Sequence, residues 1–311
     1  MDGTQTKAFK DLECSPSLMG GLRQESESFA VVNTLLTITA CLSNIVILVA
    51  LHKESSLHPP SKLLYRCLAT TDLLIGLVAQ PLYVTYWISV VHEQRNWGVC
   101  RYIGYANHTT TLGLCTVSLL TMTAISVDRL LALLLGLRYR QIVTLKRTYI
   151  IVAAIWAYSL AGAFLIIITD YRIVYLYIGT SIPLCLIISL ASYTKIFCTL
   201  RYHHTQVHDP VQHPPSQLKA LNMARYRKAV HSALWVQLAL IVCYAPSSIV
   251  LFLTIVHSGI FSSHLFVILQ ITNVLVYFNS TLNPFLYCWK ISEVRQAVKQ
   301  TIRQALCCPE S

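Results

Sequence analysis

Long uncharged stretches follow one another along the chain, each of a length that suits a helix crossing a membrane. Four of these stretches contain no Asp, Glu, Lys or Arg, and they run over Ser28–His52, Tyr102–Val127, Thr148–Thr169 and Ile173–Thr194. An α-helix needs roughly 20 apolar residues to cross the hydrocarbon layer of a bilayer. Each of the four stretches therefore predicts one membrane-spanning helix.

Two further regions supply three more spans. The stretch Ala229–Trp289 is also uncharged and is long enough for two crossings, and its segment His257–His264 has the Ser, Gly and His residues of a short surface loop. The segment Leu63–Val90 is apolar apart from Arg66 near its start and Asp72 inside it. The pattern thus predicts an all-α membrane protein, a seven-transmembrane helix bundle. Membrane β-barrels would show short alternating strands instead.

Composition and charge support this interpretation and orient the chain. Of the 311 residues, 55% are hydrophobic and only 12% are charged, whereas charge makes up about a quarter of ordinary soluble domains. With an extracellular N-terminus, most Lys and Arg residues fall in cytoplasmic loops, as the positive-inside rule requires. The net charge of +11 then faces anionic lipid, and we expect no nucleic-acid partner.

The C-terminal residues form an amphipathic pattern after the last span. Between Lys290 and Leu306, apolar residues recur three or four apart, opposite basic ones; they are Ile291, Val294, Val298, Ile302 and Leu306. This spacing predicts a short eighth helix that lies on the membrane surface, and Cys307-Cys308 after it has the pattern of a palmitoylation site. We therefore expect an extracellular tail (1–28), a seven-span domain (29–289) and a cytoplasmic end (290–311).

Each predicted span carries a short motif, and the motifs occur in a fixed order. They are Asn44, Leu68-Ala-Thr-Thr-Asp72, Asp128-Arg129-Leu130, Trp156, Tyr193, Cys243-Tyr244-Ala-Pro246 and Asn283-Pro284-Phe-Leu-Tyr287. In these motifs the chain resembles the rhodopsin-like (class A) G-protein-coupled receptors, from about Val31 to Cys308. The very short loop Asp170–Arg172 is similar to that of the group holding melanocortin, cannabinoid, lysophospholipid and adenosine receptors, with melanocortin-like sequences nearest. Leu130 and Tyr244 depart from the family, which usually has Tyr and Trp there.

Asp72 is the only carboxylate in the middle of a span, and inserting one costs about 2.5–3.5 kcal/mol. One explanation is a protonated Asp that is hydrogen-bonded to its neighbours. The resemblance implies another, an allosteric sodium ion held among five side chains, which here are Asp72, Ser118, Asn279, Ser280 and Asn283. Their oxygen atoms suit a hard cation of this kind. We expect no other cofactor or metal.

The resemblance also implies an activation switch and a heterotrimeric G protein as partner, with arrestin or a receptor kinase as further partners. In the resting state Asp128 would hold Arg129, which in the active state would turn toward Tyr193 and the G protein. An alternative is that Arg129 only anchors the end of its helix at the membrane surface. Tyr244 and Tyr287 stand beside Pro246 and Pro284, which we expect to act as hinges when helix 6 swings outward.

The ligand is limited by what the spans lack. No Asp or Glu lies between Tyr102 and Val127, so the amine-binding carboxylate of aminergic receptors is missing, and no Lys between His264 and Trp289 could bind retinal. The resemblance implies an extracellular-side pocket, although each of its residues could also serve packing alone. These residues are Tyr83, Tyr86, His108, Thr111, Leu112, Cys115, Tyr244, Ser247 and Asn273. We expect a small peptide or a lipid-like ligand.

Cys100 occupies the family's disulfide position, but the usual partner loop has no cysteine. A Cys14–Cys100 bridge and a free thiol at Cys100 both remain open. Two other functions were weighed. A non-receptor seven-helix transporter would show an internal repeat around a midplane site, which the sequence lacks. An intramembrane enzyme would need a nucleophile–base or metal constellation, so we expect the chain not to be an enzyme and place it in the plasma membrane.

Overall fold

A computed structural model describes residues 23–53, 57–92, 97–169, 171–207, 235–253, 263–290 and 292–306. The described chain is helical, and seven of its helices are long and apolar enough to cross a membrane. The prediction of a seven-helix bundle is therefore confirmed. The tail that we expected at the N-terminus lies largely outside the described residues, and the first span begins within it, at Arg23.

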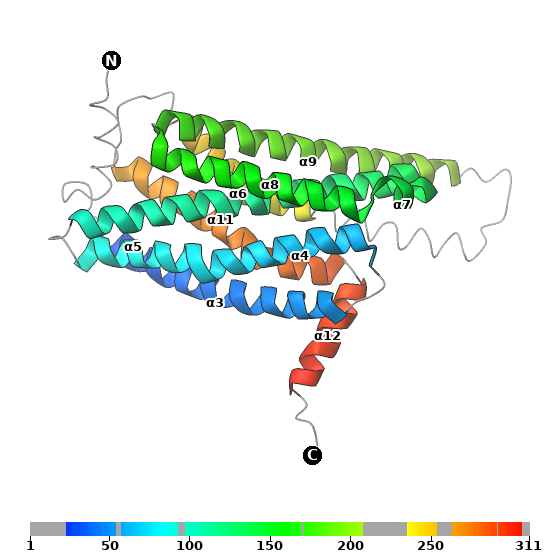
Figure 1. Cartoon of the computed structure of the whole chain (residues 1–311), viewed down its shortest axis with the longest axis horizontal. Coiled ribbons are helices and arrows are strands. Elements are labelled where there is room, and N and C mark those ends of the chain that lie inside the picture. Colours follow the sequence, from blue (N-terminus) through cyan, green and yellow to red (C-terminus); the bar gives the residue numbers. More distant parts are fainter. Residues whose placement is uncertain are drawn as a thin grey trace.

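The long helices lie side by side in alternating directions (Figure 1). The first five spans are α3 (Arg23–Lys53), α4 with α5 (Pro59–Leu74 and Gln80–His92), α6 (Trp97–Leu135), α8 (Leu145–Ile168) and α9 (Tyr171–Val207). The sixth is the helix Trp235–Leu253, and the seventh is α11 (Ser263–Lys290). Between α6 and α8 the chain forms two short elements, η2 (Gly136–Arg138) and α7 (Tyr139–Ile142).

The second span contains a π-helical turn that the hydrophobic pattern did not predict. The turn, η1 (Ile75–Ala79), joins α4 to α5 and ends just before Pro81. Proline has no backbone N–H and its ring crowds the carbonyl four residues earlier, so a wider turn before it relieves that clash. In the same turn, a Cβ on Gly76 would lie 2.9 Å from Cys41 Sγ of α3. The glycine therefore lets the first two spans approach closely beside Asp72.

The outer surface of the bundle is apolar, as contact with lipid requires. Large hydrophobic side chains such as Leu35, Phe164 and Leu184 are each more than half exposed. By contrast, many of the buried side chains are polar, including Asn44, Asp72 and Asn283. A bundle that is polar inside and apolar outside is typical of helices that carry a functional site within a membrane.

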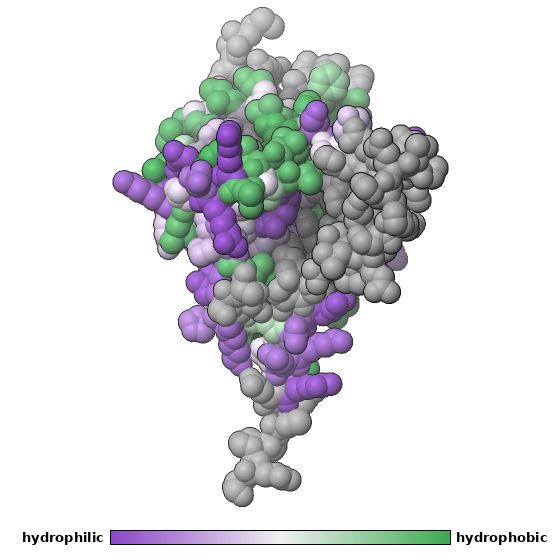
Figure 2. Space-filling model, turned by 90° about the vertical axis from the view of Figure 1, so that its right-hand side faces the viewer, coloured by the Kyte–Doolittle hydropathy of each residue, from purple (hydrophilic) through white to green (hydrophobic). Residues whose placement is uncertain are grey.

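Polar residues gather at the end of the bundle that carries α7. Figure 2 looks onto this end and shows hydrophilic residues over it and along α12 (Ser292–Leu306). The exposed basic residues of this end belong to α3, to the segment between α6 and α8, to the first turn of α8, to the C-terminal half of α9 and to α12; they are Lys53, Arg138, Arg140, Lys146, Arg147, Lys195, Arg201, Lys299 and Arg303. This distribution has the asymmetry expected of a cytoplasmic face.

The amphipathic helix α12 forms after the seventh span and turns away from the bundle axis (Figure 1). Its apolar side differs in part from the expectation. Val294 is 1% exposed and Val298 is 9% exposed, because both belong to the buried core and α12 packs against α3. Ile302 is 42% exposed. The predicted lipid-facing stripe is therefore partly a packing surface. The predicted palmitoylation site, Cys307-Cys308, lies outside the described residues.

Candidate functional site

Asp72 lies fully buried where the second, third and seventh spans meet. Its two carboxylate oxygens accept different hydrogen bonds: Ser118 Oγ donates to Oδ1 over 2.9 Å, and Asn283 Nδ2 donates to Oδ2 over 2.7 Å. The hydroxyl of Ser280 interacts with the same carboxylate. An ionised carboxylate only accepts hydrogen bonds, so two donors on two oxygens fit the charged form.

The side chains around this carboxylate leave acceptor atoms over. Asn279 Oδ1 and Asn283 Oδ1 are buried and have no hydrogen-bond partner, and the Asn279 amide nitrogen contacts Met122 Sδ at 3.4 Å. Buried acceptors that face no donor are costly unless something else binds them. Next to an anion, they fit a bound cation with oxygen ligands. The structure thus places four of the predicted sodium ligands around one point, and it aims the donor end of Asn279 elsewhere.

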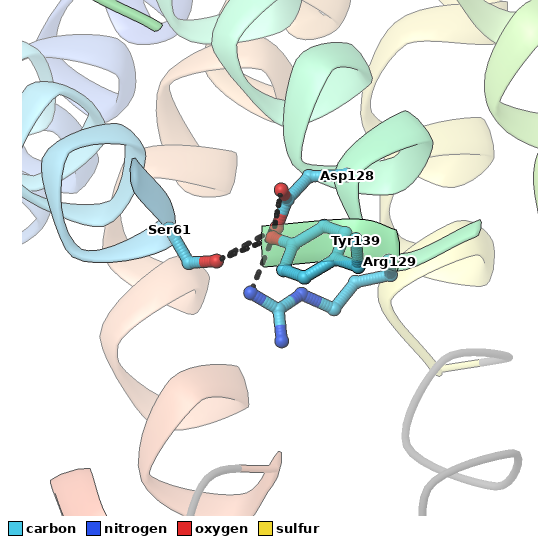
Figure 3. Close-up of polar contacts among 4 residues, drawn as sticks. All are labelled: Ser61, Asp128, Arg129 and Tyr139. Carbon is cyan, nitrogen blue, oxygen red and sulfur yellow. Dashed lines mark hydrogen bonds and ion pairs between the residues drawn. The ribbon is translucent and has the colours of Figure 1, made fainter. Parts of the chain in front are cut away.

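A second buried carboxylate, Asp128, lies near the C-terminal end of α6 (Figure 3). Arg129 Nη2 forms an ion pair with Asp128 Oδ2 over 2.8 Å, and Ser61 Oγ of α4 donates to the same oxygen over 2.9 Å. Tyr139 Oη of α7 donates to Asp128 Oδ1 over 2.5 Å. The Arg129 guanidinium also lies over the Tyr65 ring, 5.7 Å from its centroid. Two elements besides α6, namely α4 and α7, therefore hold the Asp128–Arg129 pair in place.

The segment after α6 is what brings Tyr139 back to Asp128. Gly136 has a φ of +50°, a left-handed conformation that suits glycine and lets the helix end there. The helix that follows α7, α8, is capped by Thr144, whose side chain accepts a hydrogen bond from the Arg147 N–H over 3.5 Å. Between Gly136 and Thr144, Tyr139 is buried whereas Leu137 is 97% exposed.

Sequence reasoning did not identify Ser61, Tyr139 or Leu137. A signal was present, because Tyr139 and Leu137 are apolar residues that flank basic ones in the predicted second cytoplasmic loop. The pattern alone could not tell which of them points inward. Tyr193 is buried on α9, and the helices keep Pro183 and Pro284 in their interiors. The side chain of Tyr287 lies outside the described part of the structure.

A cavity of about 220 Å³ opens between the third and seventh spans, toward the end of the bundle opposite α7. Seven of the nine predicted pocket residues line it: His108, Thr111, Leu112, Cys115, Tyr244, Ser247 and Asn273. The other two, Tyr83 and Tyr86, are not among its lining residues. They are buried in an aromatic cluster with Trp87, at ring distances of 6.1 and 5.6 Å. The expectation differed there because the pattern does not show on which side α5 packs.

Tyr244 connects this cavity with the centre around Asp72. It lines the cavity, is almost fully buried and interacts with the hydroxyl of Ser118, which in turn donates to Asp72. A polar chain thus leads from the cavity to the buried carboxylate.

Cysteine pairing separates Cys100 from the other thiols. Cys100 takes part in a disulfide bond. Of the two alternatives, the free thiol is therefore excluded in this structure, and the Cys14–Cys100 bridge stays a prediction. Its predicted partner Cys14 lies outside the described residues. The other cysteines whose side chains the structure describes are free, namely Cys41, Cys67, Cys115, Cys185, Cys198 and Cys243.

Comparison with known proteins gives a consistent picture. The family described as 7 transmembrane receptor (rhodopsin family) matches residues 43–172 and 168–287. The chain is 24% identical over 285 residues to melanocortin receptor 5 of Homo sapiens, which covers 88% of this chain and 82% of that receptor. For the Bos taurus receptor the identity is 26% over 278 residues, or 86% and 82% of the two chains. A 5-hydroxytryptamine receptor 1D of Oryctolagus cuniculus is 29% identical over 141 residues, 45% of this chain and 36% of that one.

Proposed function

The chain belongs to the rhodopsin family of seven-transmembrane receptors, and from this we propose that it binds a small extracellular ligand in the cavity around Tyr244 and activates a heterotrimeric G protein. It is a multi-pass membrane protein near the melanocortin receptors. The family consists of receptors, so the predictions that the chain is no enzyme and that it resembles class A receptors are confirmed. We place it in the plasma membrane with its N-terminus outside.

The observation that carries the proposal is that Arg129 is held in an ion pair at the end of α6. Its guanidinium is paired with Asp128, and Asp128 is itself fixed by Ser61 and Tyr139 from two other elements. An arginine that only anchored a helix end would need no such enclosure. A charge held by several weak bonds at an element boundary can be released by a modest conformational change. We therefore assign to this cluster the resting state, from which outward movement of helix 6 frees Arg129 for the G protein.

The surface next to the cluster offers a docking site for that partner. Leu137 is 97% exposed, and the basic residues Arg138 and Arg140, which follow it in the chain, are also exposed. Leu134, Ile142 and Leu145 in the same part of the chain are each more than 40% exposed. A group of exposed apolar side chains rimmed by polar residues is typical of a protein contact, and the surrounding positive charge favours an acidic partner surface. Arrestin or a receptor kinase would share this surface.

The centre around Asp72 supports sodium as a negative regulator. The residues would hold the ion through Asp72 and the free oxygens of Asn279 and Asn283, and the ion would supply the positive charge that the described neighbours of Asp72 lack. Because activation rearranges the seventh span against the second and third, an ion bound among all three would favour the resting arrangement.

The test is nucleotide exchange. Purified receptor in lipid nanodiscs is mixed with purified G-protein heterotrimers of the main α-subunit classes, and binding of a non-hydrolysable GTP analogue is followed without ligand. We expect a measurable rate, since the segment Lys219–Lys228 contains no acid that could add a second lock on Arg129. Replacing Leu137 with Ala should slow the exchange at unchanged receptor amount. A rate equal to that of empty nanodiscs for every heterotrimer would overturn the proposal.

A further inference from the structure

The cavity around Tyr244 is elongated. Along α6 its lining runs from Arg101 to Leu119, which at 1.5 Å per residue is a length of about 27 Å. The opposite walls come from α8, α9, the helix Trp235–Leu253 and α11, through residues such as Ile166, Ile182, Leu251 and Val276. A cavity whose lining extends this far along one helix fits an extended molecule better than a compact one.

The charge of the lining is one-sided. Among the lining residues that the structure describes there is no Asp or Glu, and Arg101 is the one Lys or Arg. The charged residues Glu93 and Asp170 and the side chain of Arg172 lie outside the described part. The Arg101 guanidinium lies over the ring of Tyr105, 5.8 Å from its centroid, and both residues line the cavity. The stacking orients the guanidinium at the mouth.

Below Arg101 the cavity is mainly apolar, and its polar groups are largely engaged. The hydroxyls of Thr111 and Tyr277 bond to each other over 2.6 Å, and Asn273 Nδ2 donates to Gln270 Oε1 over 3.3 Å. Ser247 Oγ is buried and has no partner. The lower cavity can therefore bury an apolar chain at little polar cost.

We propose that the ligand of this receptor is an elongated amphiphile with an anionic head group, a carboxylate or a phosphate, that binds Arg101 and an apolar body that lies along α6 toward Leu119. This inference rests on the proposed function, because it assigns a ligand class to the same cavity. A guanidinium has five donors in one plane, so it can bind a carboxylate or phosphate through two of them beside any other neighbour. A cationic peptide, by contrast, would meet Arg101 and no described carboxylate.

The test measures binding directly, without a G protein. Full-length receptor in nanodiscs is titrated with four probes that share one chain and differ in head group: oleate, oleoyl lysophosphatidate, methyl oleate and oleylamine. Displacement of a fluorescent fatty acid is read against empty nanodiscs. We expect both anionic probes to bind at least about tenfold more tightly than methyl oleate, and oleylamine to bind most weakly. Whichever of oleate and oleoyl lysophosphatidate binds more tightly shows whether the head group of the natural ligand is a carboxylate or a phosphate.

Two pairs of variants locate the two halves of the ligand. Arg101→Gln should abolish the preference for the anionic probes while methyl oleate still binds, and Arg101→Lys should retain part of it, because a lysine keeps the charge but not the planar donors. Leu119→Trp should weaken the binding of all four probes, because the larger side chain fills the end of the cavity that Leu119 lines. Leu184→Trp, on a side chain 58% exposed on the outer surface, is the matched control and should change nothing.

The outcomes separate this inference from the proposed function. Equal binding of oleate and methyl oleate, or an anionic preference that survives Arg101→Gln, would overturn the ligand class while leaving nucleotide exchange intact. Selective binding of the anionic probes that depends on Arg101 supports the ligand class even where no heterotrimer responds, and in that case only the proposed function fails.

Discussion

Two buried carboxylates on the inner side of the helices are stabilised in different ways. Asp128 is paired with Arg129, its neighbour in sequence, and is enclosed by Ser61 and Tyr139. Asp72 accepts hydrogen bonds from neutral groups, Ser118 and Asn283, and no ion pair with it occurs among the described residues. The protein therefore neutralises the first charge with its own side chain and leaves the second to an ion or a proton.

This difference predicts different sensitivities. The pair at Asp128 responds to conformation, since Arg129 is 30% exposed at the surface of the bundle and can leave when the surrounding elements move. The centre at Asp72 is fully buried, so it responds to what can diffuse into the bundle. A resting state held by both would be released by ligand at one end and would be tuned by sodium in the middle.

The largest expected effect is that sodium stabilises the receptor through Asp72 and not through Asp128. At about 100 times its dissociation constant, sodium should add roughly 2.7 kcal/mol to the stability of the folded receptor. Asp72→Asn should remove this gain entirely because the amide carries no charge. The melting temperature of purified receptor is compared in sodium chloride and choline chloride of equal ionic strength. An equal sodium-dependent rise in both proteins would show that Asp72 does not bind the ion.

Asp128→Asn tests the other centre with the same change of chemistry. Hydrogen bonds to charged groups contribute about 1.5–3 kcal/mol, and losing one should raise ligand-free nucleotide exchange by about tenfold as Arg129 is released. Surface expression normalises the rates. The sodium-dependent rise in melting temperature should persist in this variant. Exchange at the wild-type rate would mean that the pair does not restrain activation.

Tyr139→Phe removes one hydroxyl from the cluster around Asp128. A single hydrogen bond contributes about 1 kcal/mol, so ligand-free exchange should rise about fivefold. Tyr149→Phe is the matched control, because Tyr149 lies on α8 with 56% of its surface exposed. If both variants exchange at the same rate, the contact between α7 and Asp128 has no part in the resting state.

The smallest effects come from a pair of serines. Ser61→Ala removes a donor from Asp128, and Ser118→Ala removes one from Asp72. Each change should cost about 0.5 kcal/mol, the lower limit for one hydrogen bond, because other donors still hold each carboxylate. Ser61→Ala should then roughly double ligand-free exchange, and Ser118→Ala should reduce the sodium-dependent rise in melting temperature. Each variant is the control for the other readout. A crossover, with Ser61→Ala changing the response to sodium, would show that the two centres are not separate.

The sequence was enough to predict the seven spans, because uncharged stretches of helical length leave few other structures in a membrane. It also predicted Asp72 and most of its neighbours, since a charge inside such a stretch requires polar partners. The π-helical turn before Pro81 and the helix α7 escaped prediction. The first accompanies Pro81 and the close approach of α3 at Gly76, and the second follows the left-handed backbone of Gly136; hydrophobic periodicity shows neither feature.

The same limit explains the errors at the cavity and at α12. Tyr83 and Tyr86 are of a residue type common in ligand pockets, but the orientation of α5 places them in an aromatic cluster with Trp87. Val294 and Val298 have the spacing of a lipid-facing stripe, and the packing of α12 on α3 buries them. Periodicity identifies an apolar side of a helix, and only the neighbouring elements decide what covers it.

The most direct test of the whole account is the sodium dependence of ligand-free nucleotide exchange. Purified wild-type receptor in nanodiscs is incubated with a responsive heterotrimer while sodium replaces choline at constant ionic strength. A receptor whose resting state is held through Asp72 should exchange nucleotide faster than empty nanodiscs without sodium and progressively more slowly as sodium rises. Exchange that is indifferent to sodium, or no faster than in empty nanodiscs, would contradict it.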